Sequence, residues 1–231
     1  MRRSDLGLLV IHALRLGGFA DAETVASRVG GAPAEVERLL ADAALDGLVR
    51  HRATGPSGWS LTDEGRKENE RLLAEELDNS GLRVHLTEAY QRFLPLNTDL
   101  LATCTAWQVL DAGAGTLNDH TDPAYDRAVI ERLIGIDRQI QPWCAELGAE
   151  LERFAGYGPR LARAIERIEQ GDLDWFTRPT IDSYHTVWFE LHEDLLASLG
   201  LDRTSERQSA PDDHEPSSGS ATVSADLKEE D

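Results

Sequence analysis

A small set of cations between positions 38 and 67 has the residue types and spacing to bind nucleic acid. Arginine and lysine neutralise phosphates, and arginine also recognises guanine in the major groove of double-stranded DNA. Arg50 and Arg52 alternate along a short predicted strand, which places both on one strand face. The residues predicted to contact DNA are Arg38, Arg50, Arg52, Arg66 and Lys67. The alternative is a solvated surface in which the same cations form ordinary ion pairs.

The elements around these cations follow the order helix, turn, helix, hairpin, helix. Asp21 is suited to cap a helix over residues 21–29, and Pro33 suits the first turn of a second helix that Gly47 ends. Strands over residues 48–53 and 59–61 flank a glycine-containing turn, and Thr62 is suited to cap the next helix. This is the order of a winged helix-turn-helix with a two-stranded wing, in which the second helix commonly enters the major groove.

Helical spacing of apolar residues begins with residues 6–16, which we interpret as the first helix of the winged domain rather than a targeting segment. After a break at residues 78–81, the pattern is helical as far as residue 201, with Pro95 and Pro142 at expected boundaries. The helices expected in this second part cover residues 82–93, 99–110, 124–141, 142–154, 160–170 and 180–199. The fold class is therefore mostly α: an α+β winged N-terminal domain followed by an all-α helical domain.

We expect three segments: a winged domain over residues 1–78, an all-helical domain over 79–203 and a disordered acidic tail over 204–231. The net charge of the whole chain is −19. The first segment carries 10 basic and 14 acidic side chains, the second 11 and 20, and the third 2 and 8. The winged domain is the most nearly neutral segment, but it lacks the positive balance typical of DNA-binding domains, so DNA contact depends on locally placed cations.

The rest of the composition narrows the class of protein. Cys104 and Cys144 are too few for a disulfide scaffold, and neither has a second cysteine at metal-ligand spacing, which favours a reducing cytoplasm. No apolar run reaches the length of a membrane span, so we expect no membrane partner. No phosphate-binding glycine loop, zinc-protease helix or nucleophile elbow occurs, which argues against an enzyme.

Aromatic and polar residues in the helical domain suggest a ligand pocket, because helical bundles form such pockets between their helices. The residues predicted to line it are Trp107, His120, Arg178, Tyr184, His185 and Trp188. Arg178 would pair with a carboxylate or phosphate of the ligand. The alternative is an ordinary aromatic core, and Tyr184 and Trp188 share a helix face with Leu191 and Leu195 that is most simply core.

His185 and His192 project to one side of the last helix, where Asp119 or His120 could complete a metal site. No tight ligand spacing from two segments supports this, so we predict neither a metal nor a cofactor.

The stretch from Asp21 to Arg66, which ends in GLVRHRATGPSGWSLTDEGR, resembles the winged helix of MarR-type bacterial transcription regulators. The strings YQRFLPLN, LNDHTDPAYD and SYHTVWFELHEDLLASLGLDR resemble the helical C-terminal region of actinobacterial MarR-like regulators. The resemblance implies a regulator of transcription. A long separate helical domain after the winged core departs from ordinary MarR proteins, whose winged core is embedded between dimerising helices.

We therefore expect a cytoplasmic DNA-binding regulator whose helical domain senses a small molecule or a protein effector, and which can form a homodimer. The alternative is an interaction module whose winged helix docks on a partner protein, as the acidic second helix and acidic tail favour. A helical-domain enzyme or a metal-binding protein is a third alternative and would require converging polar groups around His120 and His185.

Overall fold

A computed structural model describes residues 2–55, 57–111 and 114–201, so the predicted acidic tail lies outside the described residues. The described residues as far as Leu201 form one compact unit, which is mostly helical with two small antiparallel hairpins. This confirms the predicted fold class. Along the described ranges, no helix combines the length and the apolar character needed to cross a bilayer.

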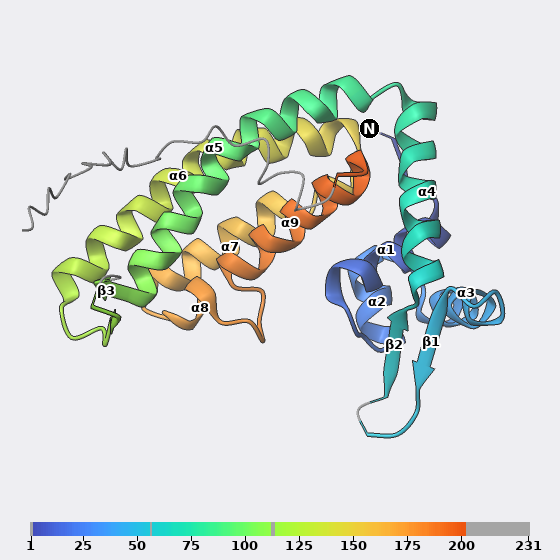
Figure 1. Cartoon of the computed structure of the whole chain (residues 1–231), viewed down its shortest axis with the longest axis horizontal. Coiled ribbons are helices and arrows are strands. Elements are labelled where there is room, and N and C mark those ends of the chain that lie inside the picture. Colours follow the sequence, from blue (N-terminus) through green and yellow to red (C-terminus); the bar gives the residue numbers. More distant parts are fainter. Residues whose placement is uncertain (1, 56, 112–113, 202–231) are drawn as a thin grey trace, which may run out of the picture. The chain divides into compact units, whose positions relative to one another are not determined.

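The winged region, residues 2–81, has the predicted order of elements (Figure 1). The Asp21 carboxylate caps its helix by accepting the Thr24 N–H at 2.8 Å, and Pro33 occupies the first turn of the next helix. The apolar faces of the first three helices of this region and Val49 form one hydrophobic core. The elements are α1 (Leu6–Gly17), α2 (Ala22–Val29), α3 (Pro33–Leu45), β1 (Val49–Arg52), β2 (Gly58–Leu61) and α4 (Asp63–Ser80).

A close backbone approach holds the wing against the start of α4. The Leu48 carbonyl accepts hydrogen bonds from the backbone N–H and the hydroxyl of Thr62, each at 3.0 Å. A Cβ at Gly65 would lie only 1.9 Å from the same Leu48 oxygen, so only glycine fits there. On the other edge of β2, Trp59 exchanges two backbone hydrogen bonds with Ala20, which ties the wing to the segment before α2.

The helical region, residues 82–201, is built on two long helices that lie side by side, α5 (Arg83–Gln108) and α6 (Pro123–Glu150) (Figure 1). The expected helix boundaries at Pro95 and Pro142 are wrong, since both prolines lie inside continuous helices. Buried residues recur every three or four positions on both sides of each proline, so packing between the helices outweighs the lost backbone hydrogen bond. These residues are Leu86, Tyr90, Phe93, Leu100, Cys104 and Trp107 in α5, and Val129, Leu133, Ile136, Ile140, Trp143 and Leu147 in α6.

The remaining boundaries of the helical region also differ from the sequence-based expectation. The chain between α5 and α6 includes a short hairpin, β3 (Val109–Asp111) with β4 (Thr116–Leu117), where a plain loop was expected. After η1 (Glu152–Phe154), α7 (Tyr157–Glu169) starts inside the expected break, with Pro159 tolerated in its first turn. A short α8 (Asp174–Thr177) occupies the expected loop, and α9 (Tyr184–Leu199) starts at the Ser183 cap rather than at residue 180.

Two hydrophobic cores, one in each region, are joined by a small third cluster of Leu8, Leu73 and Ala197. The N-terminal segment also pairs with the helical region, because Arg2 exchanges backbone hydrogen bonds with Glu150 and Glu152. The division into domains at residue 78 stays a prediction; α4 continues through that position and ends at Ser80, with Gly81 in the left-handed conformation.

Candidate functional site

Two of the predicted DNA-contacting cations already have carboxylate partners on the surface. Arg38 on α3 is paired with Asp42 at 2.9 Å, and Lys67 on α4 with Glu64 at 2.7 Å. All four side chains are more than half exposed. Exposed pairs of this kind contribute only about 0.2–1 kcal/mol, so a phosphate can replace the carboxylate partner at little cost.

The exposed face of α3 is acidic, as its sequence suggested. Glu35, Glu37 and Asp42 are exposed on it, and Asp46 follows directly after the helix. Leu45 is 88% exposed in the same neighbourhood, the highest value among the large hydrophobic side chains of the described residues. Such a face repels a phosphate backbone and suits a partner that offers cations around an apolar group.

The wing, in contrast, carries only positive or neutral side chains between Val49 and Leu61. β1 and β2 pair in antiparallel register, Arg50 opposite Ser60 and His51 opposite Trp59. The guanidinium of Arg52 lies 4.3 Å from the centre of the Phe19 ring.

Arg50, His51 and Arg52 line an open groove of about 510 Å³ beside Phe19. Arg50 and Arg66 are both exposed and have no ion-pair partner within the described part of the chain. The wing is therefore the part of the winged region best suited to a phosphate.

The residues of the predicted ligand pocket fall into separate places. Trp107 stacks on Phe176 with ring centres 4.4 Å apart, and the His120 ring lies 4.4 Å from Trp107. Tyr184 and Trp188 are buried in the core, as the helix-face argument predicted, and their ring centres lie 6.1 Å apart. Four cavities in the described part of the chain, the groove beside Phe19 among them, are lined by other residues.

The other two members of that set do not converge on a cavity either. Arg178 forms an exposed pair with Asp174, and His185 is partly buried, which lowers its pKa. His192 on the same helix is buried and lies beside the Phe93 ring at 5.2 Å. Among residues 2–55, 57–111 and 114–201, no cluster of three histidine, cysteine or acidic side chains has metal-binding geometry.

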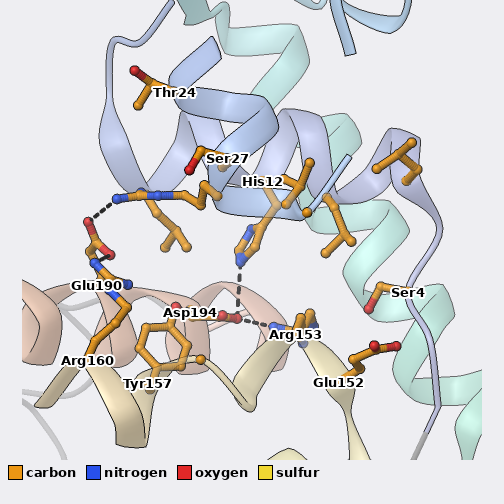
Figure 2. A pocket seen from close by; sticks show the side chains of 18 of the residues that line it. Ser4, His12, Thr24, Ser27, Glu152, Arg153, Tyr157, Arg160, Glu190 and Asp194 are labelled. Carbon is orange, nitrogen blue, oxygen red and sulfur yellow. Dashed lines mark hydrogen bonds and ion pairs between the residues drawn. The ribbon is translucent and has the colours of Figure 1, made fainter. Parts of the chain in front are cut away.

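A buried polar network at the junction of the two regions was not identified from the sequence. Its centre is Asp194 on α9, and the His12 Nε2 atom on α1 lies 3.1 Å from the Asp194 Oδ1 atom (Figure 2). The His12 Nδ1 atom lies 3.2 Å from the Asn69 side-chain oxygen on α4. An ionised Asp194 requires a proton on Nε2, and an amide side chain can serve Nδ1 as donor or acceptor. Asp194 and Asn69 therefore fix the orientation of the ring.

Arg153 and Tyr157 complete this network from the helical region. Arg153 pairs with Asp194 and also with Glu76 of α4 at 2.9 Å, while the Tyr157 hydroxyl donates to the Asp194 Oδ2 atom at 2.9 Å. Burial alone would raise the pKa of Asp194, but the charge of Arg153 and the proton donors of His12 and Tyr157 hold it well below its usual range. Burial and the adjacent carboxylate raise the pKa of Tyr157, which keeps its hydroxyl a donor.

Two further ion pairs connect the regions along α9. Glu190 lies between Arg28 of α2 at 2.8 Å and Arg160 of α7 at 2.7 Å, and Glu193 pairs with Arg15 of α1 at 3.2 Å. With Asp194, one stretch of α9 therefore presents three acids to three basic side chains of the winged region.

Beside these ion pairs lies a cleft of about 1000 Å³, which we call the junction cleft (Figure 2). Residues of α1 and α2 form one wall, and residues of η1, α7 and α9 form the other. It has about twice the volume of the groove beside Phe19. The buried network forms part of its lining.

Two sequence signals could have indicated the network. His12 interrupts the apolar run of α1 between Ile11 and Ala13, and all three residues are buried. Asn69 is likewise fully buried on α4. A polar residue at a core position needs a hydrogen-bonding partner, and Asp194 provides one, but the pairing between distant segments is visible only in the fold.

The fold and the surfaces of this chain define a winged-helix-like region joined to a mostly helical region. Comparisons with protein-family models, with curated proteins and with solved structures give no match.

Proposed function

We propose that this chain is a DNA-binding transcriptional regulator that contacts double-stranded DNA chiefly through its wing. The observation that carries the proposal is the acid-free hairpin with Arg50, His51 and Arg52 exposed along one strand. Arg66 adds an unpaired cation in the first turn of α4, and Lys67 follows directly after it. A basic wing on a winged-helix scaffold suits phosphate contact beside a groove.

The acidic face of α3 restricts how this region can approach DNA. Arg38 is the cation on that helix able to recognise guanine or a phosphate, and it must first leave Asp42. We therefore assign phosphate contact to Arg50, Arg52 and Arg66, and base or phosphate contact to Arg38. Such a regulator acts in the cytoplasm of a bacterium.

A salt series of binding to the gene's own upstream DNA, against random DNA, tests the proposal. We expect tighter binding to the upstream fragment, and Arg50→Ala/Arg52→Ala should reduce the slope of log K against log salt by about 2, since each lost phosphate contact removes about 0.9. Arg127→Ala/Arg132→Ala, which removes two exposed arginines from α6, changes the net charge equally and should leave the slope unchanged. An equal loss in both variants would contradict a role for the wing.

Docking on a partner protein is the second candidate, and exposed Leu45 within the acidic face of α3 favours it. A photo-crosslinking amino acid at position 45 tests it, with position 101 as control because Leu101 is also exposed, on α5. A discrete crosslinked protein at position 45 alone, together with absence of specific DNA binding at low salt, would replace the regulator proposal.

A further inference from the structure

The two walls of the junction cleft differ in chemistry. The α1 wall presents Leu6, Leu9 and Leu16, which are only partly buried and recur at helical spacing. The opposite wall presents Tyr157 and Arg160, among other polar groups. A cleft of about 1000 Å³ separates the two walls.

Apart from the exposed Glu23, the charged side chains that line the cleft have partners. Arg3 pairs with Glu152 at 3.1 Å, Arg28 with Glu190 at 2.8 Å, and Arg160 with both Asp182 and Glu190. Arg153 is occupied by Asp194 and Glu76. At Arg28, Arg153 and Arg160, whose side chains are at most 28% exposed, an anionic ligand would have to displace a carboxylate and a cationic ligand an arginine. This arrangement favours an uncharged occupant.

The cleft also provides hydrogen-bonding groups. Ser4 lines the cleft, but its hydroxyl oxygen is buried and lacks a hydrogen-bond partner among the described residues. Thr24 and Ser27 add hydroxyls from α2 (Figure 2). Thr24 and Ser27 are exposed, so a ligand in the cleft can hydrogen-bond to their hydroxyls.

We propose that the junction cleft binds an uncharged amphipathic small molecule. Its apolar face lies on Leu6, Leu9 and Leu16, and its hydroxyl or carbonyl groups meet Thr24, Ser27 and the polar wall. The volume of the cleft is at the upper end of the range of about 300–1000 Å³ that small-molecule pockets occupy.

A ligand in the cleft would contact both regions, because α1 and α9 both line the cleft. The Arg28–Glu190 ion pair also spans it. An effector role for the ligand rests on the proposed function: the ligand must bind the DNA-competent and incompetent states with different affinity. Binding itself does not rest on it and is measured without DNA.

The probe is N-phenyl-1-naphthylamine, an uncharged aromatic amine that fluoresces in apolar sites. Gly156 lines the cleft, and a Cβ there would meet no heavy atom within 4 Å, so Gly156→Phe adds a large side chain at the cleft wall from a Cβ that has room. Gly135 on α6 has equally open surroundings and does not line the cleft, so Gly135→Phe is the matched control. Leu9→Gln makes the apolar wall polar and provides an independent variant.

We expect saturable probe binding to the full chain, at least about tenfold weaker in Gly156→Phe and in Leu9→Gln, which corresponds to about 1.4 kcal/mol or more. Gly135→Phe should bind within about twofold of the unmodified chain, a difference of less than about 0.5 kcal/mol. Circular dichroism of each variant confirms that it is folded. Absence of saturable binding to the unmodified chain, or unchanged affinity in a folded Gly156→Phe or Leu9→Gln variant, would overturn the proposal whatever the DNA result.

Discussion

Asp194 is the residue on which the junction depends most. It is almost fully buried and charged, and its partners His12, Arg153, Tyr157 and Ser198 come from both regions. A buried carboxylate without partners is strongly unfavourable, so each partner contributes by keeping the charge tolerable. The polar cluster therefore fixes how α1 lies relative to α9.

Removing a hydroxyl that donates a hydrogen bond to the charged Asp194 should destabilise the fold more than removing a hydroxyl that donates to a neutral acceptor. Tyr157→Phe is expected to lower the free energy of unfolding by about 1.5–3 kcal/mol at pH 7, because the acceptor is charged. Tyr125→Phe is the control: its hydroxyl donates to the Ala106 carbonyl at 2.9 Å, so about 1 kcal/mol is expected. Urea unfolding of both variants measures the difference, and equal losses would contradict the assigned role of Tyr157.

The same carboxylate predicts a dependence of stability on pH. The pKa of Asp194 is lower in the folded chain than in the unfolded chain, so its stabilising contribution is complete above the unfolded value of about 4. The contribution is lost as the pH falls through the folded pKa. Tyr157→Phe should raise that folded pKa, so the stability gap to the unmodified chain should stay constant from pH 7 to about 4 and narrow in stronger acid. Urea unfolding at a series of pH values measures it; a gap that widens in acid would have the wrong sign.

At the scale of elements, two glycines are expected to respond in opposite directions to the same substitution. Gly65→Ala places a Cβ 1.9 Å from the Leu48 oxygen and should cost about 3 kcal/mol or more, because α4 must move away from the wing. Gly135→Ala, inside α6 with no heavy atom near its Cβ, should stabilise by about 0.5–1 kcal/mol through helix propensity. Thermal unfolding compares them, and a tolerated Gly65→Ala would disprove the close approach.

The winged region was predictable in detail because its signals are local. Asp21, Pro33, Gly47 and Thr62 each define an element end through their own backbone or side-chain chemistry, and the structure places elements between them as expected. The helical region was predicted less accurately. Pro95 and Pro142 indicated helix ends, but long-range packing of α5 against α6 kept both helices continuous.

Candidate sites were harder to predict than elements. Sequence spacing placed Tyr184 and Trp188 on one buried face correctly, yet it could not show that Arg178 pairs with Asp174 or that His12 meets Asp194. The His12–Asp194 contact joins residues 182 positions apart, and no local pattern encodes such a pairing. The wing cations were located from sequence because alternation along a strand is a local property.

For the molecule as a whole, the buried network should make the two regions unfold together. Trp59 is the single tryptophan before residue 82, so in Trp59→Phe the tryptophan fluorescence reports the helical region alone. We expect its urea transition to coincide with that of circular dichroism, which reports both regions. Separate transitions in this variant would show that the regions are independent.

Arg153→Met should uncouple the regions, because it leaves the buried Asp194 and the partly buried Glu76 without their cation, a loss of about 3–5 kcal/mol. The two urea transitions should then separate. Arg92→Met is the control: it breaks the exposed Arg92–Glu146 pair and should cost less than about 1 kcal/mol without separating them.

The shared carboxylate also constrains how this chain can diverge. A substitution at Asp194 leaves a histidine, an arginine and a tyrosine from three different segments without their shared partner. No single substitution in this arrangement is therefore neutral for stability. Positions 12, 153, 157 and 194 should therefore be inherited as a block. Arg38 and Lys67, whose partners are exposed, are under no such restraint, which leaves the winged surface free to acquire new specificities while the junction beneath it stays fixed.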